Sequence, residues 1–272
     1  MEIKKEYEIK DIPLADGSLI KATVLGKGEK NLIIIPGISV DSMSRIAKSL
    51  CRQYSPLAEK YKVTILDYKD IIDRYYPIEN IAKDVIFALD YLKIKSAAFY
   101  GHSLGGMVAQ SVAIDFPQYV EKLVLCCTCS QPSACLIPVI KKWKAIAEKA
   151  DVVSLATDMI ERIYSSETLE KMGTAFRFIA QTYKPERCIP FYYLTDSCLN
   201  YNRTEELKRI NAKTLVIGGE KDNIMGVESS KIIADKIPFC DCYIYENGSH
   251  TPADEHSDFF IRLLSFLEGK DF

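Results

Sequence analysis

Short apolar runs and amphipathic segments alternate along most of this 272-residue chain. Continuous apolar runs of about four to eight residues predict strands that are buried on both faces. Such runs occupy residues 31–36, 62–68, 97–100, 122–129, 213–218 and 241–245. Because helical patterns separate them, we expect an α/β fold in which a mostly parallel central sheet is flanked by helices.

The remaining periodicity predicts an opening hairpin and several helices. Residues 2–10 and 18–26 form two strand-like segments around Asp16-Gly17, which is typical of a hairpin turn. In residues 78–93 the apolar side chains recur at helical spacing, and Pro117 ends a further helix over residues 105–116. Other helices are predicted from the loop after residue 39 to about residue 60, at residues 227–237 and at residues 254–267.

The alternation stops at Gln131 and resumes after Arg203. Between them we predict only helices, at residues 138–149, 152–164, 168–183 and 187–199. A helical segment of this length is too long for a simple crossover between two strands. We therefore predict that residues 131–203 form an inserted helical cap, and that residues 1–130 and 204–272 form the core. A surface segment without a functional role is the alternative.

Composition narrows the range of partners. The net charge of −2 gives no reason to expect nucleic acid or a membrane surface as a partner. The first residues lack the apolar stretch of a signal peptide, and no stretch is long enough to span a membrane, so we expect a cytoplasmic protein. The nine cysteines are odd in number and include no C-x-x-C pair. We interpret them as reduced thiols that pack as small apolar side chains, and we expect no metal. Alternation along the predicted strand at residues 122–129 places Cys127 and Cys129 on the same face.

The sequence GHSLG at residues 101–105 fits G-x-S-x-G, the nucleophile elbow. In this motif a strand turns sharply into a helix and exposes a serine hydroxyl at the turn. Here the motif lies between the predicted strand at residues 97–100 and the predicted helix at residues 105–116. Ser103 is therefore the candidate nucleophile, and a glycine-rich turn in an inert domain is the alternative.

A serine hydroxyl needs a base and an acid that orients the base. Of the three histidines, His102 points away from its neighbour Ser103 at an elbow, and His256 is expected to cap a helix or lie on the surface. His250 follows a predicted strand and is our candidate base. Asp222 follows the preceding strand at the same sheet edge, and we favour it over Glu220 as the acid because the glycine pair lets the chain turn before it.

The developing oxyanion needs preorganised N–H donors. The backbone N–H of Leu104 opens the helix after the elbow, where the helix dipole also favours negative charge. The second donor should come from the loop after residues 31–36, and the backbone N–H of Ile38 is the best placed.

These motifs resemble the α/β-hydrolase family, and the similarity to its capped serine esterases spans nearly the whole chain. The acid motif of the family is matched by GEKD at residues 219–222, and its histidine loop by GSH at residues 248–250. The family's His-Gly-x loop is represented by PGI at residues 36–38, without the histidine. Residues 67–70, DYKD, depart from the family's Asp-x-Arg-Gly loop. The resemblance implies an α/β-hydrolase fold and excludes the branches with an aspartate nucleophile.

We therefore expect a serine hydrolase that cleaves a carboxylic ester or thioester of a small or medium apolar acyl group. The expected partner is a small-molecule acyl substrate, with no cofactor, and the sequence leaves open whether the chain forms a homodimer. A carbon–carbon bond hydrolase or an acyltransferase with the same triad is one alternative. A small-ligand binding protein without turnover on the same scaffold is another.

Overall fold

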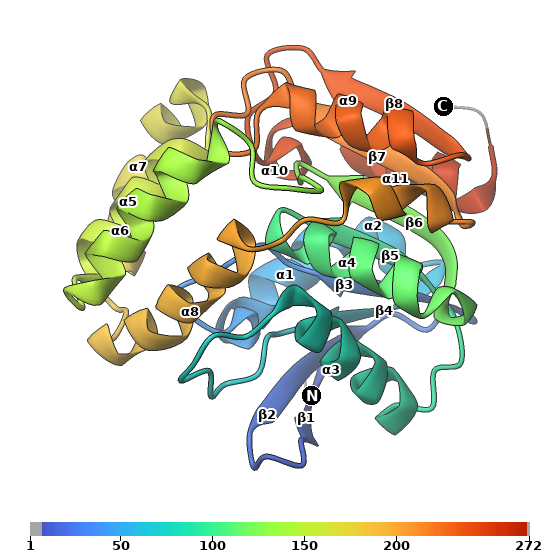
Figure 1. Ribbon diagram of the computed structural model, residues 1–272, viewed down its shortest axis with the longest axis horizontal. Helices are drawn as coiled ribbons and strands as arrows, with labels where there is room; N and C mark the ends of the chain where they lie inside the picture. The colour runs from blue at the N-terminus through green and yellow to red at the C-terminus, as the bar shows by residue number, and fades with distance from the viewer. Residues whose placement is uncertain (1–6, 271–272) are drawn as a thin grey trace, which may run out of the picture.

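Eight strands form one sheet in the order β1-β2-β4-β3-β5-β6-β7-β8. The computed structural model describes residues 7–270 (Figure 1). The strands are β1 Tyr7–Pro13, β2 Leu19–Leu25, β3 Lys30–Ile35, β4 Tyr61–Leu66, β5 Ala97–His102, β6 Val120–Cys126, β7 Lys213–Gly219 and β8 Cys240–Tyr245. The hairpin of β1 and β2 is antiparallel, as is the pairing of β2 with β4, and the pairings from β4 to β8 are parallel. The predicted α/β architecture is confirmed.

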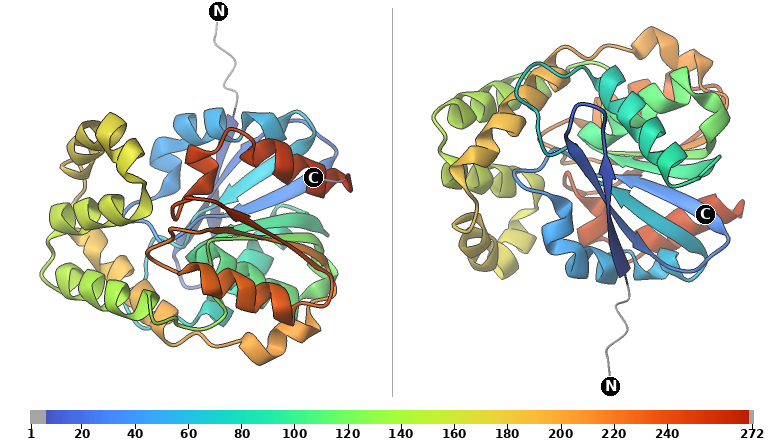
Figure 2. Two further views of the ribbon diagram at one scale, coloured as in Figure 1. Left: turned by 90° about the horizontal axis from the view of Figure 1, so that it is seen from above. Right: turned by 90° about the horizontal axis from the view of Figure 1, so that it is seen from below.

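Helices cover both faces of the sheet (Figure 2). One face packs against α1 Ala47–Gln53, α2 Ser55–Ala58 and α11 Phe259–Glu268. The other face packs against α3 Ile78–Tyr91, α4 Leu104–Asp115 and α9 Val227–Lys236. Alternation within β3 explains how one strand serves both cores, since Ile33 faces one core and Ile34 the other.

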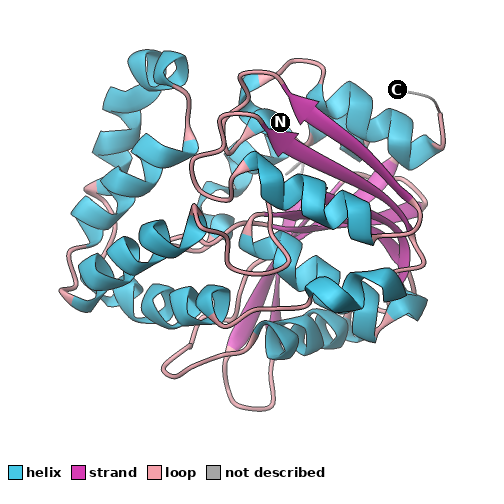
Figure 3. Cartoon of the chain, turned by 45° about the horizontal axis from the view of Figure 1, so that its top comes forward, coloured by secondary structure: helices cyan, strands magenta, loops and turns pink. Residues whose placement is uncertain are grey.

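Four longer helices separate β6 from β7: α5 Leu136–Glu148, α6 Val152–Ile163, α7 Ser166–Ala180 and α8 Cys188–Leu199. Within residues 131–203, all of which the structure describes, no strand occurs. These helices lie to one side of the sheet, on the side toward which strand arrowheads point (Figure 3). The carboxyl ends of parallel strands, where ligands bind in such sheets, therefore face the helical segment.

Two predicted helices are interrupted in the structure. The predicted helix up to residue 60 is divided into the 3-10 turn η1 Met43–Ile46, α1 and α2, because Pro56 cannot continue a preceding helix. The predicted helix over residues 254–267 is divided into α10 Pro252–Glu255 and α11. The break falls at His256, whose ring stacks on Tyr245 at 4.3 Å between centroids. Helical periodicity alone shows neither break, because the first arises from a proline and the second accompanies a ring contact with a distant strand.

Short 3-10 turns complete the chain: η2 Pro117–Tyr119, η3 Pro185–Arg187 and η4 Thr204–Arg209. The nine cysteines all lie within residues 7–270, and they form no disulfide with one another. Within residues 7–270, no helix combines the length and the apolar character that crossing a bilayer requires.

Candidate active site

Ser103 occupies the turn between β5 and α4 in a strained backbone conformation. Its φ is 55° and its ψ is −121°, a backbone conformation that residues other than glycine rarely adopt. The N–H of Ser103 donates to the carbonyl oxygen of Cys126 at 3.0 Å, which ties the turn to the neighbouring strand β6. Backbone strain of this kind persists only where the surroundings hold it, and it is common at functional sites.

The glycines of the motif are required by close contacts. A Cβ on Gly105 would lie 2.0 Å from the carbonyl oxygen of Ile35. A Cβ on Gly101 would lie 2.5 Å from the carbonyl oxygen of Gly105. Both distances are far below van der Waals contact, so strand and helix can approach this closely only without side chains at these two positions.

His250 and Asp222 meet at the same edge of the sheet, in loops that follow β8 and β7. The Nδ1 of His250 lies 2.9 Å from Oδ1 and 3.0 Å from Oδ2 of Asp222, and both side chains are buried. The expected contact between these two residues is confirmed. An Nδ1–H that donates to the carboxylate leaves Nε2 as the proton acceptor.

The surroundings of Asp222 favour its ionised form. Burial opposes ionisation, but the neighbouring His250 and the backbone N–H groups of Ile224 and Met225 together lower the pKa of Asp222. Both N–H groups donate to Oδ1, at 2.9 Å and 3.0 Å. The carboxylate is therefore fixed in orientation and charged, as a group that orients an imidazole must be.

Glu220 lies elsewhere. Its carboxylate accepts the backbone N–H of Asn247 at 2.9 Å, and its side chain is exposed. Glu220 thus stabilises the loop that precedes His250, while Asp222 makes the contact with the imidazole.

His102 is the functional-site residue that sequence reasoning missed. Its Nε2 lies 2.8 Å from the carbonyl oxygen of His250, and because a carbonyl can only accept, the proton of His102 is on Nε2. Burial and the neighbouring His250 lower the pKa of His102 to about 4, so its ring is neutral near pH 7. His102 lines the same cavity as Ser103 and joins the elbow to the loop that carries His250.

A cavity of about 190 Å³ contains Ser103, His102 and His250 in its wall. Ile38 also lines this cavity. The adjacent Gly37 is so close to the elbow that a Cβ there would lie 3.6 Å from Oγ of Ser103. Leu104 is the first residue of α4, where a backbone N–H has no partner within the helix. The structure thus brings Ile38 and Leu104 to the surroundings of Ser103.

Residues from the predicted cap form part of the apolar wall of the same cavity. Trp143 comes from α5, Met159 and Ile163 come from α6, and Tyr164 directly follows α6. The side chains of Trp143 and Met159 are buried although they lie outside the sheet layers. Segment 131–203 therefore supplies part of the wall around Ser103.

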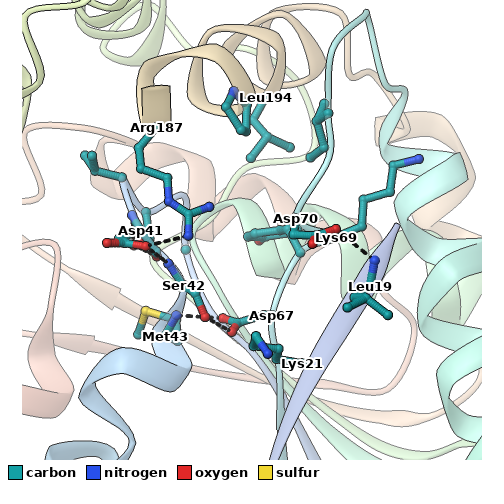
Figure 4. A pocket seen from close by; sticks show the side chains of 16 residues that line it. Leu19, Lys21, Asp41, Ser42, Met43, Asp67, Lys69, Asp70, Arg187 and Leu194 are labelled. Carbon is teal, nitrogen blue, oxygen red and sulfur yellow. Dashed lines mark hydrogen bonds and ion pairs between the residues drawn. The ribbon is translucent and has the colours of Figure 1, made fainter. Parts of the chain in front are cut away.

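A second cavity of about 260 Å³ adjoins the first, sharing Gly37, Ser39 and Met43 with it (Figure 4). Figure 4 shows Arg187, from the helical segment, pointing toward Asp41 in the loop after β3. Their ion pair measures 3.1 Å. This pair fastens the helical segment to the loop that contains Ile38.

A second polar link joins the helical segment to the histidine loop. Glu255 accepts from the hydroxyl of Ser249 at 2.6 Å and from the backbone N–H of Ser165 at 2.8 Å. Ser165 caps the N-terminus of α7, and Ser249 directly precedes His250. Hydrogen bonds with Ser249 and Ser165 lower the pKa of Glu255 although burial opposes this, so its charge supports both contacts.

The cysteines after β6 differ from their predicted arrangement. Alternation places Cys127 and Cys129 on one face, but Cys127 packs in one core and Cys129 in the other. The reason is that β6 ends at Cys126 and that Cys127 has a φ of +46°, which ends the alternation. Of the described residues that line the cavity at Ser103, none is Cys126, Cys127 or Cys129.

Comparisons with known proteins agree with the observed fold. A family model described as alpha/beta hydrolase fold matches residues 51–151. Proline iminopeptidase PfmaB of Pestalotiopsis fici is 25% identical over 80% of this chain and 85% of its own length. The 2-hydroxy-6-oxononadienedioate/2-hydroxy-6-oxononatrienedioate hydrolase of a Pseudomonas species is 25% identical over 76% of this chain and 77% of its own length.

Among solved structures, the enol-lactonase from Burkholderia xenovorans LB400 superimposes with a TM-score of 0.82 at 18% identity. The match covers 95% of this chain and 100% of the enol-lactonase chain. A hydrolase from Pseudomonas aeruginosa PA01 matches with a TM-score of 0.81 at 21% identity, over 96% of this chain and 98% of that one. At this level of identity the structural similarity concerns the fold.

Proposed function

We propose that this chain is a serine hydrolase of the α/β-hydrolase fold superfamily, which cleaves a carboxylic ester or thioester through an acyl-enzyme. The observation that carries the proposal is the hydrogen bond between His250 and Asp222 beside the strained Ser103. A buried imidazole with a carboxylate on Nδ1 and a serine in the same cavity is the arrangement required for nucleophilic catalysis.

In the proposed first step, Oγ of Ser103 attacks the carbonyl carbon of the substrate while Nε2 of His250 takes the hydroxyl proton. Asp222 holds the tautomer and stabilises the imidazolium. The N–H groups of Ile38 and Leu104 are assigned to the oxyanion, which the dipole of α4 also favours. The imidazolium then protonates the leaving oxygen or sulfur, and the carbonyl forms again as the acyl-enzyme.

In the second step, His250 takes a proton from water, which attacks the acyl-enzyme and releases the carboxylic acid. Ser103 recovers its proton from the imidazolium. His102 acts as a positioning residue, because its hydrogen bond to the carbonyl oxygen of His250 holds the histidine loop against the elbow.

We assign the acyl group to the apolar part of the catalytic cavity, which Trp143, Met159 and Ile163 help to form. A volume of about 190 Å³ suits a short or medium acyl chain. A larger polar cavity of about 730 Å³ meets the catalytic cavity at Tyr164 and Asp254. Its size and polar lining fit the leaving group rather than the acyl chain.

The proposal is tested by measuring hydrolysis of three kinds of substrate. These are p-nitrophenyl esters, short acyl-CoA thioesters and a ketone that can be hydrolysed only at a carbon–carbon bond. We expect a burst of p-nitrophenol followed by slower turnover, and we expect both to be lost in Ser103→Ala. Preference for the carbon–carbon substrate would assign the alternative hydrolase class. Ligand binding without a burst by the folded protein would indicate a binding protein.

A further inference from the structure

Three side chains that can ligate a metal meet behind the catalytic cavity. The Sγ of Cys127, a carboxylate oxygen of Asp222 and a ring nitrogen of His250 all lie within 4.8 Å of one another. All three side chains are buried. They come from the loops after β6, β7 and β8, so the cluster exists only because three neighbouring strands end at one sheet edge.

The position of Cys127 is set by the backbone. Its N–H donates to the carbonyl oxygen of Ile217 in β7 at 2.9 Å, and its positive φ turns the chain out of the strand direction. Its Sγ lies 3.9 Å from the carbonyl oxygen of Ser249, next to His250. The proposed mechanism gives this thiol no part, and the thiol does not line the cavity around Ser103.

We propose that Cys127, Asp222 and His250 form a binding site for Zn²⁺ that switches off the catalytic base. Thiolate, imidazole and carboxylate are the ligands that Zn²⁺ takes, whereas Mg²⁺ and Ca²⁺ take oxygen ligands. Binding rests on the geometry of the three side chains alone. The inhibitory effect rests in addition on the proposed function of His250.

Zn²⁺ takes the place of the proton in the hydrogen bond between His250 and Asp222. The ion bonds to Nδ1 of His250, Oδ2 of Asp222 and Sγ of Cys127, with water in the fourth position. The thiol proton is released to solvent, and the imidazole proton moves from Nδ1 to Nε2. No electron is transferred, and Oδ1 of Asp222 keeps its two backbone N–H donors. With a proton on Nε2, His250 cannot accept the proton of Ser103.

The geometric adjustment is small. Ligand atoms around a tetrahedral Zn²⁺ are separated by about 3.3 Å when the bonds to nitrogen and oxygen are near 2.0 Å. Nδ1 of His250 and Oδ2 of Asp222 are now 3.0 Å apart, and the three ligand atoms lie within 4.8 Å of one another. The histidine loop must therefore move by a few tenths of an ångström, and the thiol by no more than about 1 Å.

The test compares wild type with Cys127→Ser, Cys127→Ala and the control Cys129→Ser. Cys129 is an equally buried thiol two residues away that is not part of the cluster. Zn²⁺ binding is measured by equilibrium dialysis with metal analysis, and Co²⁺ is used as a spectroscopic probe of thiolate ligation. Ester hydrolysis is measured over a range of buffered Zn²⁺ concentrations, and each variant is compared with its own metal-free rate.

We expect wild type and Cys129→Ser to bind one equivalent of Zn²⁺ and to lose activity, with a Co²⁺–thiolate charge-transfer band. In both Cys127 variants the band should disappear and the inhibition constant should rise at least about 100-fold, since loss of an outer-shell partner alone costs about 10–100-fold. Mg²⁺ should not inhibit any of the proteins.

Equal Zn²⁺ inhibition in wild type and the folded Cys127 variants would overturn the site, as would an active wild type that binds no Zn²⁺. Two Cys127 variants are compared so that a folding defect in one of them does not decide the result. Circular dichroism is used to check that both variants are folded. One equivalent of Zn²⁺ with the thiolate band in a protein without hydrolase activity would support the site and contradict the proposed function.

Discussion

Nε2 of His102 donates a hydrogen bond to the carbonyl oxygen of His250, at 2.8 Å. His102 directly precedes Ser103, and the two histidine rings lie 5.0 Å apart between centroids. One hydrogen bond therefore links the turn that holds the proposed nucleophile to the loop that holds the proposed base.

We predict that His102→Ala lowers kcat about fivefold and changes KM little, since a lost hydrogen bond of about 1 kcal/mol affects the placement of His250. His102→Gln, whose amide N–H can also donate, should recover part of this loss. Steady-state kinetics on a p-nitrophenyl ester measures the division between kcat and KM. An effect on KM alone, or no recovery with glutamine, would contradict a positioning role.

His102 should also affect how stability depends on pH. Its pKa is lowered from 6.5 to about 4 in the folded protein by burial and by His250, so between these values the unfolded chain binds a proton that the folded protein does not. Stability is therefore complete above about pH 6.5 and decreases as the pH falls toward 4, by on the order of 2 kcal/mol for this partly exposed ring.

Urea unfolding of wild type and His102→Gln at a series of pH values measures this effect, and the variant should show a shallower decrease between pH 6.5 and 4. Asp222 acts in the same direction, but only below its ordinary pKa of 3.8. Equal slopes in the two proteins would show that His102 does not cause the decrease.

The residue that orients His250 can be identified by comparing two substitutions that each replace a carboxylate with an amide of the same size. Asp222→Asn should lower kcat by about 10⁴-fold, because an amide favours the wrong tautomer of His250. Glu220→Gln should change kcat less than about threefold, since Glu220 contacts the backbone N–H of Asn247 and not the imidazole. A larger loss in Glu220→Gln than in Asp222→Asn would reverse the assignment.

The apolar cavity predicts a preference for longer acyl chains. From acetyl to butyryl or hexanoyl esters, each added methylene should raise kcat/KM by about fourfold, because burial of one methylene contributes roughly 0.8 kcal/mol. Met159→Trp should shift the optimum toward acetyl, because Met159 lines the cavity. The control Val153→Trp, on the exposed side of the same helix, should leave the profile unchanged.

A wild-type kcat/KM that does not depend on acyl-chain length would show that segment 131–203 does not select the substrate. The same chain-length profile in wild type and Met159→Trp would show this as well. A profile altered equally by Val153→Trp would indicate a general disturbance of α6 rather than a filled cavity.

The sheet and the elbow were predictable because their signals are local. The apolar runs at β3 to β7 specify buried parallel strands, and the glycines at positions 101 and 105 are needed where β5 and α4 approach. Ser103, Asp222 and His250 each follow a strand of the parallel part of the sheet, and this was enough to predict that they lie at one sheet edge.

Other features depend on contacts between distant segments. The sequence does not show that His102 reaches the carbonyl oxygen of His250, a contact across 148 positions. The face of Cys127 was predicted wrongly because alternation holds only within a strand, and β6 ends one residue earlier. The break at His256 is accompanied by stacking of its ring on Tyr245, a contact that helical periodicity cannot indicate.

The central claim is that Ser103 is the nucleophile, and mass spectrometry after reaction with a fluorophosphonate probe tests it most directly. The strained turn, the nearby Gly37 and the shared cavity with His250 predict one adduct, on Ser103, and no adduct in Ser103→Ala. The adduct should form much more slowly in Asp222→Asn, because the base is then in the wrong tautomer. An adduct on another residue, or none on the folded wild-type protein, would contradict the account.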